Sequence, residues 1–162
     1  MTDLTPPTLA PNVRLRDAEP SDLEVIMSME TTTFTSDAWS RELMAAELAA
    51  PHTRYIVALI GRQVVGYAGL SALPRATQAD VQTIAVVAAH RRQGIGALLL
   101  RRLIDEANAR GVADVLLEVR ADNPGAQRLY EVHGFTAIAV RPRYYQPDDV
   151  DALVMRWEAP RE

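Results

Sequence analysis

The sequence predicts a mixed α/β protein of the α+β type. Its centre is expected to be a mixed, mostly antiparallel twisted sheet of about six to seven strands, flanked by about four helices. Short segments rich in Val, Ile and Leu are typical of strands. Longer segments between them have apolar residues at helical spacing and capping residues at their ends, which is typical of helices. No internal repeat or interdomain linker interrupts this pattern.

Seven segments are expected to be strands. They span residues 13–16, 54–60, 64–70, 80–87, 115–119, 136–140 and 152–157. The first alternates as an edge strand does, and Gly61-Arg62-Gln63 predicts a hairpin between the second and third. Val115–Val119 is nearly continuously apolar, which predicts a strand covered on both faces. Residues 141–151 are expected to form a loop between the last two strands.

Capping residues mark the ends of four expected helices. Ser21-Asp22-Leu23-Glu24 has the pattern of a capping box, and Ser40 begins a second helix. Gly111 ends the third helix, and the fourth begins at Asn123 and ends at Gly134. The expected helices run from the capping box toward Met29, over 41–49, over 97–110 and over 124–133.

The composition is that of one ordinary globular domain. The chain has 162 residues, of which 48% are hydrophobic and 23% charged, and this is enough to bury a core. Residues 1–12, rich in Pro and Thr, are expected to form a flexible tail, and residues 13–160 a single domain. The net charge of −4 argues against direct binding of nucleic acid, which requires a concentrated basic surface.

Several absences narrow the chemistry. The chain has no cysteine, which excludes disulfides, thiolate metal ligands and a cysteinyl intermediate. Its three histidines share no ligand spacing, so no metal is expected. No apolar run approaches the roughly 20 residues that a membrane helix needs, and no signal peptide is visible. We therefore expect a cytoplasmic protein without a membrane partner.

The segment Arg91–Gly96 predicts a binding loop for a phosphorylated cofactor. It joins an apolar run at 83–87 to an amphipathic segment at 97–110, in the order strand, loop, helix. Two glycines at i and i+2 remove Cβ atoms that would block a ligand, and the free N–H groups of a helix start attract a pyrophosphate. A tight turn without a ligand is the alternative. A P-loop is excluded because the chain has no lysine, and a dinucleotide motif because Leu99 replaces the third glycine.

Two motifs in the correct order resemble the GNAT (GCN5-related) acetyltransferase superfamily. "TIAV" followed by "RRQGIGALLLRRLIDEA" resembles its acetyl-CoA motif, Q/R-x-x-G-x-G/A, at a strand–loop–helix junction. Downstream, "LLEVRADNPGAQRLYEVHGF" resembles the second motif, in which a strand is followed by Asn and by a helix with L-Y-x-x-x-G-F. The resemblance implies the GNAT fold, with acetyl-CoA as the co-substrate.

Nearly all of the chain after the tail is similar to the bacterial RimI-type ribosomal-protein N-terminal alanine acetyltransferases. The similarity is carried by "DAWSRELMAAEL", "LEVRADNPGAQRLYEVHGF" and "RPRYYQPDDVDALVMRW". This chain departs from the RimI pattern at Ala38, which replaces a proline, at Ala88-Ala89, which replaces Asp-Pro, and at Arg143, which replaces the Asn of Asn-Tyr-Tyr. The resemblance implies transfer of an acetyl group to the N-terminal α-amine of a protein such as a ribosomal protein.

Other functions and assemblies remain open. The departure at Arg143 touches the expected acceptor loop, so a small-molecule amine N-acetyltransferase is one alternative. A non-catalytic module that binds acetyl-CoA is another, although such a module would need no catalytic residues. We expect a monomer or a weak homodimer.

The resemblance also assigns residues to acetyl-CoA. The edge of the strand at residues 84–86 would pair with the pantetheine arm, and an N–H near Val86 would bind the thioester oxygen. Loop N–H groups would hold the pyrophosphate, and Asn123 would contact the cofactor while capping its helix. The expected cofactor residues are Ile84, Ala85, Val86, Arg91, Arg92, Gln93, Gly94, Ile95, Gly96, Ala97 and Asn123.

Two residues are candidates for catalysis. Glu118 is a carboxylate within an apolar strand, where it either faces solvent or pairs with Arg120. The resemblance implies a third role for Glu118, as the general base acting through water. Tyr130 is either an ordinary core residue or, by resemblance, the general acid that protonates the leaving thiolate. The resemblance also implies that the acceptor binds at Trp39, Tyr144 and Tyr145, with exposed packing as the alternative for the two tyrosines.

Overall fold

The computed structural model describes residues 12–160. The expected tail at residues 1–12 lies outside this range except for Asn12. Within the described residues, no helix is long and apolar enough to cross a membrane.

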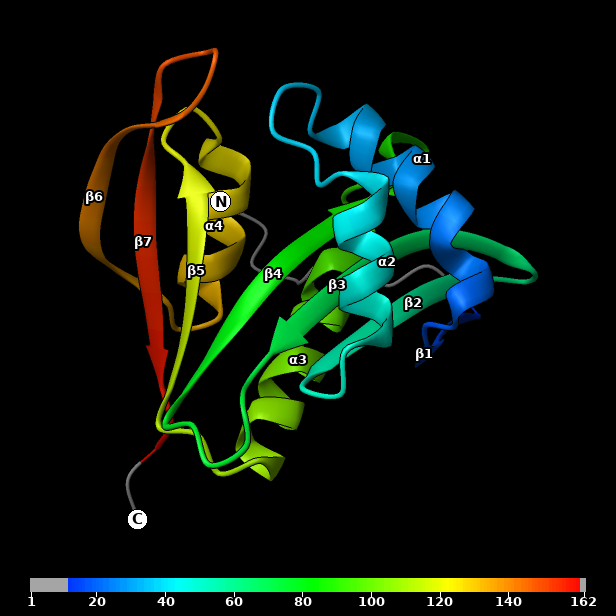
Figure 1. Ribbon diagram of the computed structural model, residues 1–162, viewed down its shortest axis with the longest axis horizontal. Coiled ribbons are helices and arrows are strands. Elements are labelled where there is room, and N and C mark those ends of the chain that lie inside the picture. The colour runs from blue at the N-terminus through cyan, green and yellow to red at the C-terminus, as the bar shows by residue number, and fades with distance from the viewer. Residues whose placement is uncertain (1–11, 161–162) are drawn as a thin grey trace, which may run out of the picture.

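A seven-stranded sheet runs through the molecule in the order β1-β2-β3-β4-β5-β7-β6 (Figure 1). The strands are β1 (Val13–Asp17), β2 (Thr53–Ile60), β3 (Gln63–Ser71), β4 (Gln78–Val86), β5 (Asp114–Arg120), β6 (Thr136–Tyr145) and β7 (Val150–Glu158). β4 and β5 are parallel, and the other neighbouring strands are antiparallel. The expected mixed, mostly antiparallel sheet is confirmed.

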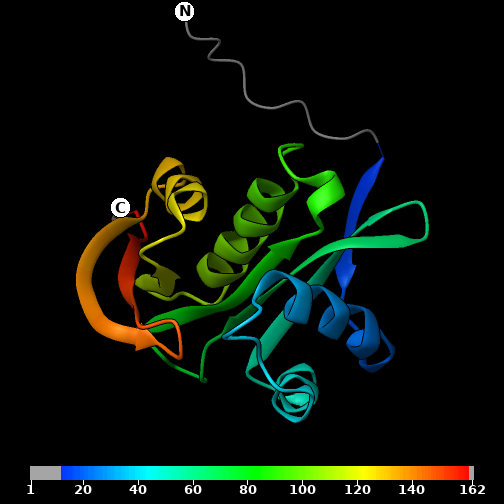
Figure 2. The same ribbon diagram turned by 90° about the horizontal axis from the view of Figure 1, so that it is seen from above.

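Two pairs of helices cover opposite faces of this sheet. They are α1 (Leu23–Thr33), α2 (Arg41–Ala49), α3 (Ile95–Ala109) and α4 (Pro124–Val132). Figure 2 shows α1 and α2 on one face and α3 and α4 on the other. Each face has its own apolar core, built around Met44 and Tyr67 on the α1–α2 side and around Leu99 and Phe135 on the α3–α4 side.

The sheet divides between β4 and β5. These strands pair only from Gln78–Asp80 to Asp114–Leu116, and farther along the chain they diverge into a V (Figure 1). Beyond Asp80, the edge of β4 that faces β5 is therefore open. The V opens toward the start of α3 and the end of β5, and both of these carry residues that the sequence assigns to the site.

Several sequence-based expectations were wrong in detail. The capping box pairs Glu19 with Asp22, because a 3-10 turn at Pro20–Asp22 precedes α1, and the helix continues beyond Met29 to Thr33. β5 is not covered on both faces, since every second residue along it is partly or fully exposed.

The expected loop at residues 141–151 is mostly strand. β6 continues to Tyr145 and pairs with β7 at Arg141–Ala152 and Tyr145–Val150, with an irregular register between these pairs. Tyr144 and Tyr145 therefore lie at the end of a strand and not within a long loop.

Candidate active site

A cleft of about 1520 Å³ occupies the V between β4 and β5. Its walls come from both faces of the sheet: α1 and the segment that follows it, β4, the start of α3, β5, α4 and the end of β6. Typical small-ligand pockets measure about 300–1,000 Å³, so this cleft has room for a large cofactor together with part of an acceptor.

The structure brings together almost all of the residues expected from the sequence. The cleft is lined by Trp39, Ile84, Ala85, Val86, Arg91, Arg92, Gly94, Ile95, Gly96, Ala97, Glu118, Asn123, Tyr130, Tyr144 and Tyr145. Gln93 is not among the lining residues, and its side-chain oxygen lies 3.4 Å from Nδ1 of His90. The sequence assigns Gln93 to the cofactor through the N–H groups of the loop, and this assignment stays a prediction.

The glycine loop is shaped by two left-handed residues. Arg92 has a φ of 63° and Gly94, which precedes α3, has a φ of 80°. The first N–H groups of α3 have no partner within the helix and point out of its start. A Cβ on Gly96 would lie 3.4 Å from Leu129 Cδ2 and 3.9 Å from Val86 Cγ2, within the cleft wall. This cradle, with two arginines beside it, fits the pyrophosphate of acetyl-CoA.

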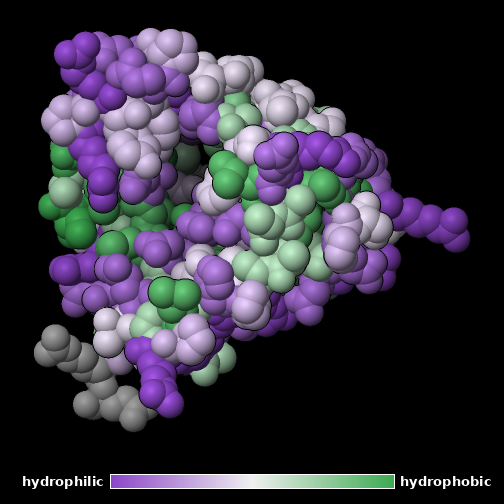
Figure 3. All heavy atoms as spheres, viewed as in Figure 1, coloured by the Kyte–Doolittle hydropathy of each residue, from purple (hydrophilic) through white to green (hydrophobic). Residues whose placement is uncertain are grey.

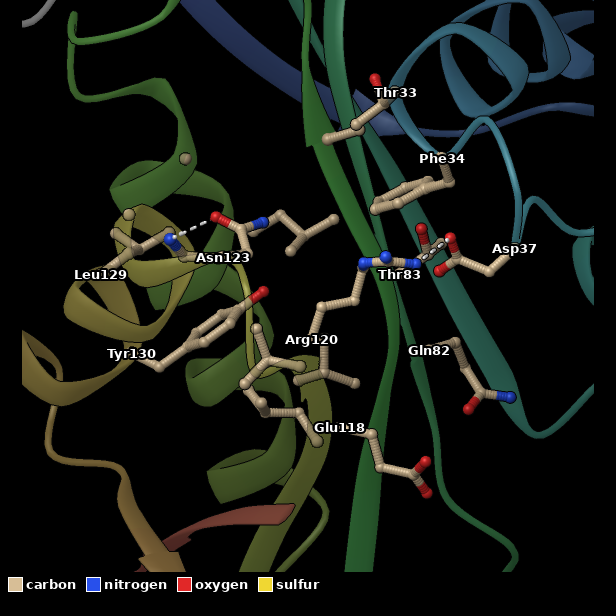
Figure 4. A pocket seen from close by; sticks show the side chains of 18 of the residues that line it. Thr33, Phe34, Asp37, Gln82, Thr83, Glu118, Arg120, Asn123, Leu129 and Tyr130 are labelled. Atoms are coloured by element: carbon tan, nitrogen blue, oxygen red, sulfur yellow. Dashed lines mark hydrogen bonds and ion pairs between the residues drawn. The ribbon is translucent and has the colours of Figure 1, made fainter. Parts of the chain in front are cut away.

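The far side of the cofactor region is formed by α4. Asn123 caps this helix, because its Oδ1 accepts a hydrogen bond of 3.1 Å from the N–H of Ala126 (Figure 4). Asn123 thus has the structural role that the sequence indicates and also lines the cleft.

Tyr130 reaches the middle of the cleft from α4. It is only 6% exposed, and its ring packs edge-on against Phe135 at 5.9 Å between centroids. Its hydroxyl nevertheless points into the cleft (Figure 4). Burial raises the pKa of Tyr130 above that of an ordinary tyrosine, so the hydroxyl keeps its proton at neutral pH.

Glu118 projects into the cleft from β5. Its side chain is 31% exposed, and its Oε1 lies 3.6 Å from Nε of Arg141 on β6. Arg120, which the sequence offered as a partner, instead forms ion pairs with other carboxylates. Hydrogen bonding to Glu118 raises the pKa of Tyr144, and burial, together with the charge of Glu118, raises the pKa of Asp80 on β4.

Aromatic side chains line the end of the cleft beyond Glu118. Tyr144 and Tyr145 stack edge-on, with 5.1 Å between ring centroids, and the Arg120 guanidinium lies 5.2 Å from the centre of the Tyr145 ring. Tyr144 is 49% exposed, so this end is open to a larger molecule. Trp39, from the segment between α1 and α2, also lines the cleft.

One important residue, Glu30 of α1, was missed by the sequence reasoning. It is 1% exposed and accepts hydrogen bonds from the Trp39 N–H at 2.9 Å, from the Thr83 hydroxyl at 3.1 Å and from the Tyr67 hydroxyl. The available signal was its spacing, because Glu30 follows the buried Ile26 by one helical turn and so lies on the core face.

The two ends of the cleft differ in charge. Arg91 and Arg92 flank the glycine loop, whereas the end near Glu118 has four carboxylates in its wall against two guanidiniums, those of Arg120 and Arg141; the carboxylates are those of Asp37, Asp80, Glu118 and Asp148. The first end suits phosphates, and the second suits a positively charged group such as an ammonium.

Comparison with known proteins agrees with this geometry. The acetyltransferase (GNAT) family matches residues 23–135. N-alpha-acetyltransferase RimI of Mycobacterium tuberculosis is 41% identical over 139 residues, which cover 84% of this chain and 86% of that protein. The [ribosomal protein bS18]-alanine N-acetyltransferase of Escherichia coli K12 is 46% identical over 80 residues, 48% of this chain and 54% of that protein.

The fold is also found among solved structures. The crystal structure of the ribosomal-protein-S18-alanine N-acetyltransferase from Escherichia coli aligns with a TM-score of 0.83 and 30% identity, covering 93% of this chain and 96% of that one. The resemblance read from the two sequence motifs is confirmed. With its strand–loop–helix motif at the mouth of a divided sheet, this chain belongs to the GNAT family of acetyltransferases.

Proposed function

We propose that this protein transfers an acetyl group from acetyl-CoA directly to the N-terminal α-amine of another protein. The observation that carries the proposal is the single cleft, which joins the glycine loop, Tyr130 and Glu118 and then opens at an acidic, aromatic end. RimI-type relatives that act on alanine N-termini of a ribosomal protein support this choice of acceptor. Residues 13–160 would act as one catalytic domain in the cytoplasm.

Acetyl-CoA would lie along β4 and over the start of α3. The N–H groups at Gly94–Ala97 would hold its pyrophosphate, and the open edge of β4 at Ile84–Val86 would pair with its amide-bearing arm. Asn123 and Arg91–Arg92 would border this region. The thioester of acetyl-CoA supplies the activated acetyl group.

Glu118 would take the proton of the acceptor, either directly or through a water. An N-terminal ammonium has a pKa near 8, so losing a proton at neutral pH requires only modest help. As the neutral amine nitrogen forms its bond to the acetyl carbon, the bond from that carbon to sulfur breaks, and the nitrogen loses its remaining surplus proton to solvent. Tyr130, which burial keeps protonated, would donate its proton to the departing sulfur.

The acceptor would enter between Trp39 and the Tyr144–Tyr145 pair. The open, partly exposed surface at Tyr144 fits a peptide that continues out of the cleft. A small amine needs no such opening, and a closed acidic pocket would have favoured it instead. The intact pair of Glu118 and Tyr130 argues against a module that only binds acetyl-CoA.

The test is acetyl transfer to a defined panel. Purified protein and acetyl-CoA are incubated with peptides that differ in their first residue, with N-terminally blocked peptides that contain lysine, and with polyamines. We expect acetylation of free N-termini, located on the α-amine by fragmentation mass spectrometry. Acetylation of polyamines or lysine alone would contradict the proposed acceptor.

A further inference from the structure

The guanidinium of Arg120 holds together segments that are far apart in the chain. Its nitrogens lie 3.3 Å from Asp37, 2.9 Å from Asp122 and 3.0 Å from Asp148. Arg120 and Asp37 are 18% and 21% exposed, so this ion pair lies in the wall of the cleft and not on open surface. Figure 4 shows the Arg120 side chain reaching from β5 across to Asp37.

Two of these contacts cross between separate walls of the cleft. Asp37 lies in the segment between α1 and α2, 83 residues from Arg120, and Asp148 lies in the turn between β6 and β7, 28 residues away. Asp122, by contrast, is two residues from Arg120, so its two hydrogen bonds with the guanidinium, at 2.9 and 3.1 Å, link nothing distant. The guanidinium therefore ties the wall that contains Trp39 to the wall that contains Tyr144 and Tyr145.

The segment with Asp37 has a second attachment of a different kind. The buried carboxylate of Glu30 binds the N–H of Trp39 at 2.9 Å, and it is fixed in turn by Thr83 and Tyr67. Glu30 itself is only 1% exposed. The Arg120–Asp37 pair lies only two residues before Trp39 and is partly exposed, and such pairs are individually weak and screened by salt. The segment is thus held firmly by the hydrogen bond to Glu30, whereas its ion pair with Arg120 can open.

We propose that Arg120 is a positioning residue that latches the two walls of the acceptor groove together through Asp37 and Asp148. The latch sets the width of the groove and places Trp39 opposite Tyr144 and Tyr145. It acts on acceptor binding and not on the chemical step, and this consequence rests on the proposed function. Three carboxylates around one guanidinium leave net negative charge, so an incoming ammonium does not meet an electrostatic barrier.

Three isosteric variants test the latch: Asp37→Asn, Asp148→Asn and the matched control Asp122→Asn. For the first two we expect the acceptor KM to rise about threefold to fivefold, as the loss of one partly exposed ion pair predicts. kcat and the KM for acetyl-CoA should stay within about twofold, and Asp122→Asn should change none of the three by more than this. Thermal unfolding of each variant verifies the fold.

A double variant gives a sharper result. If the latch needs both contacts, breaking either one opens it. The double variant Asp37→Asn with Asp148→Asn should therefore raise the acceptor KM hardly more than either single change does. Two independent effects would instead multiply. Added salt should raise the acceptor KM of the wild type and of Asp122→Asn more than that of Asp37→Asn, in which the latch is already open.

Hydrogen–deuterium exchange tests the same latch without any acceptor. In Asp148→Asn, exchange at residues 34–40 should become faster although the substitution lies in a different loop, and Asp122→Asn should leave it unchanged. This measurement needs no acetyl transfer, so it tests the latch even if no N-terminus is acetylated. A failure of the proposed function is therefore distinguishable from a failure of the latch. The latch is refuted if Asp148→Asn and Asp37→Asn match Asp122→Asn in both exchange and acceptor KM.

Discussion

The two ends of the cleft are built in different ways. Most of the expected cofactor residues belong to one continuous stretch, from Ile84 on β4 through the glycine loop to Ala97 on α3, and only the far side of this end comes from α4. The acceptor end is assembled from segments far apart in the sequence, and side chains such as Arg120 and Glu30 hold them together. Figure 3 shows hydrophilic and apolar residues mixed over the face seen in Figure 1.

This difference decides which substitutions matter at each end. A backbone site depends on turns and on the absence of Cβ atoms, so most side-chain changes there should have small effects. A side-chain site depends on single charged or hydroxyl groups, so isosteric changes there should be informative. The catalytic pair lies between the two ends, where Tyr130 comes from α4 and Glu118 from β5.

Tyr130→Phe should have the largest effect. It removes one hydroxyl and leaves the ring against Phe135, so folding and acetyl-CoA affinity should hold while kcat falls about 100- to 10,000-fold, the usual contribution of an acid–base group. Because burial raises the pKa of Tyr130, ionisation of this group should not lower the wild-type rate below about pH 10. Steady-state kinetics across pH measures both effects. Wild-type turnover in Tyr130→Phe would make this tyrosine a core residue only.

Glu118→Gln should come next, with an effect that depends on pH. At about pH 6 an N-terminal amine of pKa near 8 is charged, and loss of the base should lower the rate about 100-fold. Above about pH 9 the amine is already neutral and the defect should shrink. A lysine acceptor, with a pKa near 10.4, would shift this recovery upward by about two units. A defect that stays constant from about pH 6 to 10 would indicate a structural carboxylate.

The same contrast between the two ends of the cleft explains which parts of the site could be predicted from the sequence. The glycine loop was predictable because its parts are contiguous and its turn requires glycine. The Arg120 cluster was not, because Asp37 and Asp148 are far from Arg120 in the sequence and their chemistry is ordinary for a surface. Tertiary pairing alone brings them together.

The fold also contains one part that local sequence patterns did not predict. Within residues 12–160, the seven strands and the four α-helices were all predicted, because apolar runs and capping residues mark them locally. The extension of β6 through Arg141 to Tyr145 was missed, since charged residues and a proline are typical of loops. These residues are held as a strand by pairing with β7, and that pairing is not visible in a local pattern.

Gly96→Val should weaken acetyl-CoA binding without unfolding the protein. A Cβ there meets Leu129 at 3.4 Å, which the wall tolerates, but a larger side chain would enter the cradle. An overpacking cost of about 1–3 kcal/mol corresponds to about a 5- to 150-fold weaker Kd. Calorimetry should rank the affinities as wild type, Gly96→Ala, Gly96→Val. Gly94 is a poorer test, because its left-handed φ of 80° would add backbone strain to any substitution. Unchanged affinity in a folded Gly96→Val would reject the cradle.

Glu30→Gln should have the smallest effect on activity and is the sharpest test of the acceptor end. Glutamine keeps the shape, but it is neutral and has one acceptor oxygen, so it cannot accept from the Trp39 N–H at 2.9 Å and from the Thr83 and Tyr67 hydroxyls together. The charge-assisted bond to the Trp39 N–H is weakened, and the segment before α2 should loosen. We expect the acceptor KM to rise about twofold to fivefold, with a loss of about 1–3 kcal/mol in unfolding free energy.

Tyr67→Phe is the matched control for Glu30→Gln. It removes a different hydrogen bond to the same carboxylate and leaves the Trp39 contact in place. It should lower the free energy of unfolding by a similar amount while leaving the acceptor KM near that of the wild type. Chemical denaturation and acceptor kinetics on both variants separate the two effects. If Tyr67→Phe raises the acceptor KM as much as Glu30→Gln does, Glu30 supports the core and does not position the acceptor wall. If only Glu30→Gln raises it, the buried anchor and the Arg120 latch act on the same segment from opposite sides.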